Sequence, residues 1–150
     1  MVHQSAQNIS TSSLKEPQPR VGGLMEYVPN IGKNGVLVAI GGRVFDGKQT
    51  LTSADTGRLL DFDSVDVYDI ASHQQEEGGI WYSQRTSGDI PPPRIDSCSI
   101  MASAPDNSTH NIYIYGGQNP INKTYYDDIY VLSLPSFTWI KLYQAASGRY

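Results

Sequence analysis

The feature that most constrains this chain is a pair of apolar runs that each end in two glycines. The first, GVLVAIGG, spans residues 35–42, and the second, NIYIYGG, spans residues 111–117. A Pro-Arg pair precedes each run, so that 22 residues separate Arg20 from Gly42 and 23 separate Arg94 from Gly117. The same markers in the same order, at nearly the same spacing, indicate an internal repeat.

The repeat continues beyond the glycines. Each pair is followed by an acidic segment that carries a tyrosine, DSVDVYDI at 63–70 and DDIYVLSL at 127–134, and then by a segment that carries a tryptophan. Polar and apolar residues alternate in these segments, as they do in half-buried strands. No segment sustains a helical period. The sequence therefore predicts an all-β fold with strands near 20–28, 35–41, 64–70, 79–85, 95–103, 111–116, 127–134 and 137–143.

The repeated order of Arg, Gly-Gly, Tyr and Trp resembles the kelch repeat, one four-stranded blade of a β-propeller. The resemblance covers about residues 19–145, and the phrases YIYGGQNP and DDIYVLSLPSFTW are similar to kelch-repeat proteins of filamentous fungi, which are cell-surface or secreted proteins. It implies that the marker residues serve packing, because glycines permit close backbone approach and large rings fill the gap between blades. These residues are Gly41, Gly42, Tyr68, Trp81, Gly116, Gly117, Tyr130 and Trp139.

The resemblance also implies a division of the chain. We expect a flexible polar segment at 1–18, a first blade at 19–90 with a long loop at 43–62, a second blade at 91–146, and the start of a third blade at 147–150. Propellers close with about four to eight blades. We therefore expect an incomplete propeller, as a fragment or truncated product that needs further blades or self-association to close.

Composition excludes several partners. The net charge is -4 and no basic cluster occurs, which argues against nucleic acid, since phosphate neutralisation needs grouped Lys and Arg. No apolar stretch approaches the roughly 18 residues needed to span a bilayer. The N-terminus lacks the apolar core of a signal peptide. The compartment stays open, although the resemblance and the glycosylation sequons at Asn8, Asn107 and Asn122 suggest an extracellular or cell-surface location.

The sequence shows no catalytic or metal-binding constellation and implies no cofactor. The glycines do not have the G-x-G-x-x-G spacing that a dinucleotide fold needs. The three histidines are expected to be solvated loop residues, and Cys98 a small buried filler. The acidic residues of the two tyrosine segments are expected to be solvated strand edges or strand entries; they include Asp61, Asp63, Asp66, Asp127 and Asp128.

The leading functional hypothesis is a non-enzymatic scaffold that binds a protein or a glycan. Propellers commonly bind partners through the loops between the second and third strands and between blades. These loops are 43–62, 118–126 and 86–93, and the candidate contact residues are Arg43, Asp46, Lys48, Asp55, Arg58, Gln118 and Asn119. One alternative is part of a propeller enzyme, galactose-oxidase-like or a hydrolase, with catalytic residues outside this chain. Another alternative is an intracellular kelch adaptor.

Overall fold

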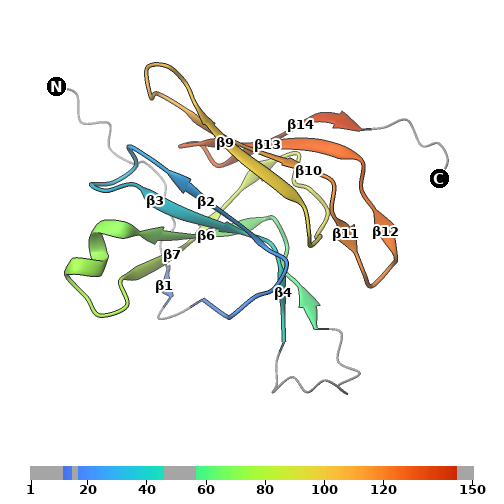
Figure 1. Cartoon of the computed structure of the whole chain (residues 1–150), viewed down its shortest axis with the longest axis horizontal. Coiled ribbons are helices and arrows are strands. Elements are labelled where there is room, and N and C mark those ends of the chain that lie inside the picture. The colour runs from blue at the N-terminus through green and yellow to red at the C-terminus, as the bar shows by residue number, and fades with distance from the viewer. Residues whose placement is uncertain (1–11, 15–16, 46–56, 145–150) are drawn as a thin grey trace.

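The chain folds into two twisted antiparallel sheets that pack face to face (Figure 1). The computed structural model describes residues 12–14, 17–45 and 57–144. Within these ranges the structure has no α-helix, and the one helical turn is the 3-10 helix η1, Ile70–Gln74. The prediction of an all-β fold built from two four-stranded antiparallel blades is confirmed. Each sheet in addition carries a short fifth strand at its outer edge.

The first sheet, which we call blade 1, has the strand order β1-β7-β6-β3-β2. Its four main strands follow one another along the chain, each antiparallel to the next, so that short connections suffice. The fifth strand, β1, pairs with β7 and comes from the segment that we expected to be a polar lead-in. The bounds are β1 Ser12–Leu14, β2 Leu24–Val28, β3 Val36–Ile40, β6 Ser64–Asp69 and β7 Ile80–Arg85.

The second sheet, blade 2, has the order β8-β14-β13-β10-β9. Its four main strands repeat the pattern of blade 1, whereas β8 lies parallel to β14. The bounds are β8 Ser87–Gly88, β9 Cys98–Ser103, β10 His110–Tyr115, β13 Asp128–Leu134 and β14 Thr138–Gln144. Two small hairpins complete the fold, β4 Arg43–Val44 with β5 Arg58–Leu59, and β11 Gln118–Asn119 with β12 Thr124–Tyr125.

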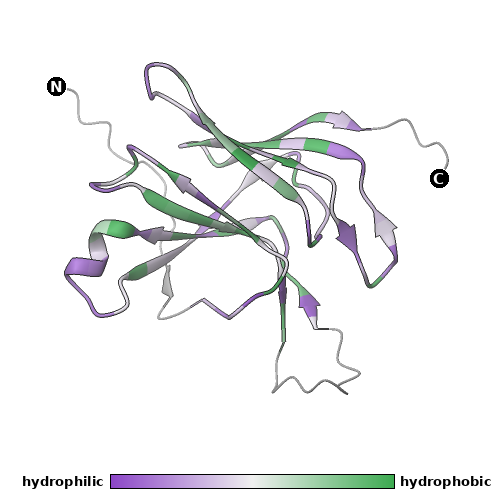
Figure 2. Ribbon diagram, viewed as in Figure 1, coloured by the Kyte–Doolittle hydropathy of each residue, from purple (hydrophilic) through white to green (hydrophobic). Residues whose placement is uncertain are grey.

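The core lies between the two blades and draws alternate residues from each. In Figure 2 the hydrophobic residues concentrate along central strands such as β3, and hydrophilic residues mark the connecting loops and strand β11. Burial removes each side chain from water and stabilises the fold by about 1.5–3 kcal/mol per large aliphatic residue. The buried cluster consists of Val28, Val36, Val38, Ile40, Phe62, Val65, Ile112, Ile114, Tyr130, Leu132, Leu134, Phe137 and Trp139.

Phe62 joins the two blades. Its ring stacks on Trp139 with the centroids 5.8 Å apart, and its carbonyl oxygen accepts hydrogen bonds from the Trp139 Nε1 at 3.0 Å and from the Thr86 hydroxyl at 2.6 Å. Both aromatic rings are almost completely buried. Such stacked pairs contribute about 0.5–1.5 kcal/mol beyond the apolar area they bury. The end of the segment predicted as a long loop thus supplies a central contact of the core.

The tyrosine and tryptophan markers do not occupy matching positions in both blades. Trp81 pairs through Tyr68 with Leu37, and Trp139 pairs through Leu132 with Ile112. Leu37 and Ile112 each lie four residues before the first glycine of their pair, so the tryptophans are at equivalent levels. Tyr68 shares that level, whereas Tyr130 lies opposite Ile114, two residues nearer the glycines.

The two blades also differ in which markers they bury. Tyr130 and Trp139 lie in the core, with 4% and 1% of their surfaces exposed. The rings of Tyr68 and Trp81 contact each other, with their centroids 5.0 Å apart. Both are only half-buried, because they lie on the face of blade 1 that points away from blade 2.

Candidate functional site

Both hairpins leave their blades at the same structural point, directly after the glycine pair. A single backbone bridge anchors each one, Val21 with Arg43 in blade 1 and Ile95 with Gln118 in blade 2. The returning chain is held in the same way, since Leu60 and Tyr126 each donate a backbone hydrogen bond of 2.9 Å to the second glycine of their pair. The hairpins therefore project from the same end of the two blades, toward the bottom of Figure 1. We call this end the hairpin face.

The second glycine of each pair is required by close backbone contact. Gly117 has φ +93, and a Cβ there would lie 2.7 Å from the carbonyl oxygen of Ile95. Gly42 has φ +101, and a Cβ would lie 3.2 Å from the backbone of Gly23. L side chains rarely adopt this conformation. The glycines let the start of each inner strand approach the end of the second strand, which positions the hairpin that follows.

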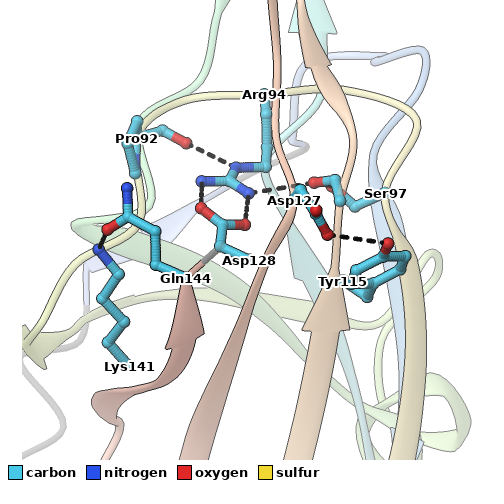
Figure 3. A network of polar contacts seen from close by, with 9 residues as sticks. Pro92, Arg94, Ser97, Tyr115, Asp127, Asp128, Lys141 and Gln144 are labelled. Atoms are coloured by element: carbon cyan, nitrogen blue, oxygen red, sulfur yellow. Dashed lines mark hydrogen bonds and ion pairs between the residues drawn. The ribbon is translucent and has the colours of Figure 1, made fainter. Parts of the chain in front are cut away.

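A buried arginine holds the base of the hairpin face in blade 2 (Figure 3). Arg94 is 1% exposed, forms a two-pronged ion pair with Asp128, and donates to the carbonyl oxygens of Gly116 at 3.0 Å and Pro92 at 3.1 Å. The ring of Tyr126 covers the guanidinium at 3.7 Å from its centroid. Paired planar donors and acceptors make this a strong and directional contact. It ties the inner strand, the glycine pair and the third strand together.

Blade 1 repeats this arrangement with Arg20. Its guanidinium pairs with Asp66 and donates to the carbonyl oxygen of Gly41 at 3.2 Å, while 16% of each charged side chain stays exposed. We call the two sets the arginine clamps. The expectation that Asp66 is a solvated strand-edge carboxylate is therefore wrong, whereas Asp128 begins β13, the strand entry expected of it. An arginine at the start of the same blade pairs with each carboxylate, so that Asp128 is buried and Asp66 is mostly buried.

The predicted contact residues of the hairpin face fall into three groups. Asp46, Lys48 and Asp55 lie outside the described residues. Arg43 and Arg58 lie on the β4–β5 hairpin. The Arg43 guanidinium lies over the Phe45 ring, 5.1 Å from its centroid, and Arg58 is exposed.

Arg58 borders a pocket of about 300 Å³ that also contains the first arginine clamp and the carboxylates of Asp61 and Asp63. This pocket opens beside the glycine pair of blade 1, since Gly41 is among its lining residues.

The remaining predicted residues, Gln118 and Asn119, brace the β11–β12 hairpin. Gln118 donates to the Asp96 carboxylate at 3.0 Å. The Asn119 side-chain oxygen accepts from the backbone amides of Ile121 at 3.0 Å and Asn122 at 3.3 Å. These bonds fix the turn, as Asn side chains do when they bond to the backbone two residues ahead. Gln118 and Asn119 thus position the hairpin, and their own polar atoms are engaged in doing so.

Two apolar residues of this hairpin escaped the sequence analysis. Ile121 is 59% exposed and Tyr125 is 81% exposed, although the turn between them is held by the Asn119 and Asn122 side chains. The sequence carried a signal for them, because large apolar residues stand inside an otherwise polar loop. Together they place two hydrophobic side chains on a braced support at the hairpin face.

The sequons differ in what the structure describes. Asn107 lies exposed in the turn between β9 and β10, and Asn122 lies exposed at the tip of the β11–β12 hairpin. Asn8 lies outside the described residues. Asn107 and Asn122 therefore lie in turns near opposite ends of the blade 2 strands.

Two further interpretations need correction. Cys98 is exposed at the start of β9, because its side chain lies on the face of blade 2 that points away from the core. His110 is a buried strand residue, 2% exposed, whose Nδ1 lies 2.7 Å from the Ser103 hydroxyl. His73 is exposed, as expected, and hydrogen-bonds to Tyr68.

Among the described residues, no three His, Cys, Asp or Glu side chains gather as metal ligands. The described part of the chain also contains no helix of the length and hydropathy that crossing a bilayer requires.

Sequence comparisons identify the repeat. The chain is 37% identical over 125 residues, 81% of its length, to a kelch repeat-containing protein of Arthroderma benhamiae. The two blades are kelch repeats. Kelch relatives also include Host cell factor of Drosophila melanogaster, 32% identical over 55% of this chain, and acyl-CoA-binding domain-containing protein 4 of Arabidopsis thaliana, 30% identical over 67%.

The kelch relatives are much longer than this chain. It spans 16% of the Arthroderma protein, 5% of Host cell factor and 14% of the Arabidopsis protein. No protein-family model matches it.

Proposed function

We propose that this kelch chain is a non-enzymatic scaffold that binds a protein partner through its hairpin face. The observation that carries the proposal is the pair of exposed apolar side chains, Ile121 and Tyr125, on a hairpin whose backbone is fixed by Asn119. Protein contacts concentrate their binding energy in a few aromatic and apolar anchors surrounded by polar groups. An anchor held on a rigid support loses less conformational entropy when it binds.

The surroundings of the two anchors support a protein partner. Polar side chains border them, including Gln118, Asn122 and Lys123 of the same hairpin, and the β4–β5 hairpin adds Arg58 at the same end of the molecule. Arginine and tyrosine are enriched at protein interfaces. A tyrosine ring could also stack on a sugar, so the experiment includes an outcome that identifies a glycan.

The test is a comparison of three immobilised chains: the wild type, the double variant Ile121→Ser with Tyr125→Ser, and the control Ile140→Ser. Ile140 is 45% exposed but lies on a sheet face away from the hairpins. The proposal predicts a protein from the source organism that the wild type and the control retain and the double variant loses. Equal retention by all three chains would contradict the proposal. Loss of binding after the partner is deglycosylated would assign the site to a glycan.

A further inference from the structure

The tip of the β11–β12 hairpin contains a sequon whose acceptor nitrogen is presented to solvent. Asn122, Lys123 and Thr124 have the Asn-x-Thr pattern of N-glycan acceptors. Asn122 is exposed, and its side-chain oxygen accepts the backbone N–H of Thr124 at 3.1 Å. This bond fixes the carboxamide, and the carboxamide nitrogen has no acceptor among the described residues. The folded hairpin therefore holds this nitrogen at its surface with no hydrogen bond to break.

N-glycosylation joins that nitrogen to a preassembled oligosaccharide. The side-chain nitrogen of Asn122 forms a bond with the anomeric carbon of the first sugar, and the bond from that carbon to the pyrophosphate of a lipid-linked oligosaccharide breaks. The pyrophosphate leaves with the electron pair, the nitrogen loses one proton, and no atom is oxidised or reduced. The transferase requires a hydroxyl at the third position of the sequon, which Thr124 supplies. The product is a bulky, hydrophilic group at the surface.

The position of Asn122 places such a group between the two apolar anchors of the hairpin face. Ile121 directly precedes Asn122, and Tyr125 follows it by three residues. The strands of this hairpin are two residues long each, whereas a stable protein contact covers about 800 Å² on each partner. A protein that buries both anchors therefore also covers the hairpin tip, where the glycan would begin.

The second described sequon differs in this respect. Asn107 is exposed in the turn between β9 and β10, at the other end of blade 2. The six residues of β10 separate this turn from the glycine pair. At about 3.3 Å per residue, they place Asn107 about 20 Å from the base of the β11–β12 hairpin. A glycan on Asn107 starts far from the anchors and provides an internal control.

We propose that Asn122 is an N-glycan acceptor and that its glycan closes the hairpin face to a protein partner. The second part rests on the proposed function, because closing the face has a consequence only where the face binds. The chain then exists in two forms. The unmodified form leaves Ile121 and Tyr125 open to a protein, and the glycosylated form shields them. Occupancy at one residue thus sets the fraction of chains that can bind.

The first experiment identifies the modified residue after the 150-residue chain is secreted from a eukaryotic host behind a cleavable leader. Peptide mapping by mass spectrometry, before and after treatment with peptide N-glycosidase, locates each glycan. Thr124→Ala removes the sequon but keeps Asn122 and its bond to the backbone of residue 124. We expect a glycan on Asn122 in the wild type and in Thr124→Ser, which keeps the hydroxyl, and none in Thr124→Ala. Circular dichroism verifies that each chain is folded.

The second experiment measures the shielding with a probe of protein size. The probe is an antibody fragment selected to bind the unglycosylated wild-type chain and to lose binding when Ile121→Ser and Tyr125→Ser are combined. The glycosylated wild type should bind it about tenfold more weakly, or worse, than Thr124→Ala from the same host, as when anchor residues are lost. Thr109→Ala, which removes the sequon of Asn107, is the matched control and should bind as weakly as the wild type. Enzymatic removal of the glycan should restore tight binding.

Two results would overturn the proposal. A secreted, folded wild-type chain without a glycan on Asn122 would show that this residue is not an acceptor. A glycosylated wild type that binds the fragment as tightly as Thr124→Ala would show that the glycan leaves the hairpin face open. Neither readout depends on a natural partner, so they remain distinct from a failure of the proposed function, which the retention of a protein by the unglycosylated chain decides.

Discussion

At the scale of single residues, the arginine clamps and the glycine pairs set the base of the hairpin face. Arg94 and Asp128 are buried together, and each satisfies the charge of the other. Removing one member leaves an uncompensated buried charge, which costs more than the pair itself contributes. Arg20 and Asp66 make the same contacts with more solvent access, so water can compensate for part of a lost partner.

The clamps predict unequal losses of stability. Arg94→Ala should lower the free energy of unfolding by about 3–5 kcal/mol, because the Asp128 carboxylate stays buried without its partner. Arg20→Ala should cost less, since Asp66 is partly solvated. Urea unfolding followed by tryptophan fluorescence, at one fixed protein concentration, measures both losses. An equal loss for the two variants would show that burial does not set the difference.

The glycine prediction separates backbone conformation from steric contact. Gly117→Ala and Gly78→Ala both place a side chain at positive φ, which costs about 1–3 kcal/mol. Only Gly117 also meets backbone, with the Ile95 carbonyl oxygen 2.7 Å from the new Cβ, whereas no atom lies within 4 Å at Gly78. Gly117→Ala should therefore lose clearly more stability in the same urea assay. Matching losses would argue against a packing role for the glycine pair.

At the scale of elements, the strands follow from the sequence and several of their contacts do not. The apolar runs before the glycine pairs identify β3 and β10, and the alternating polar and apolar residues identify β6 and β13. The role of Phe62 was hidden because it follows a long polar segment, and its partner, Trp139, lies 77 residues away. The arginine clamps left a clearer signal in the sequence, since Asp66 and Asp128 each precede a marker tyrosine by two residues.

Register and exposure could not be predicted in the same way. Because loop lengths differ between the repeats, sequence spacing does not fix which residues lie opposite each other. The two-residue offset between Tyr68 and Tyr130 is visible only in the strand pairing. Cys98 was misjudged because small residues in a strand suit either face. Its exposure depends on which side of β9 packs against blade 1.

The contact between the blades predicts a large effect at Phe62. Phe62→Ala removes the ring that stacks on Trp139 and leaves a cavity between the sheets, which should cost about 3–5 kcal/mol. Tyr125→Ala is the control, because 81% of Tyr125 is exposed and its loss should change stability by no more than about 0.5 kcal/mol. Thermal and urea unfolding of both variants measure the difference. A small loss at Phe62 would mean that the blades do not depend on this contact.

At the scale of the whole molecule, the two kelch blades share one core. The inner strands β2 and β9 meet through the Ser99 hydroxyl, which donates to Glu26. The buried cluster takes residues from β2, β3 and β6 of blade 1 and from β10, β13 and β14 of blade 2. A blade by itself would expose one side of this core. We therefore expect the two blades to unfold together, and the hairpin face to open at lower free energy because its residues make few buried contacts.

Native-state hydrogen exchange, read by mass spectrometry, tests this shared core most directly. The amides of β3 and β6 in blade 1 and of β10 and β13 in blade 2 should exchange with the same free energy of opening. Phe62→Ala should lower that free energy in both blades by the same amount. Strands of one blade that exchange independently of the other, or a Phe62→Ala effect confined to blade 1, would contradict the account.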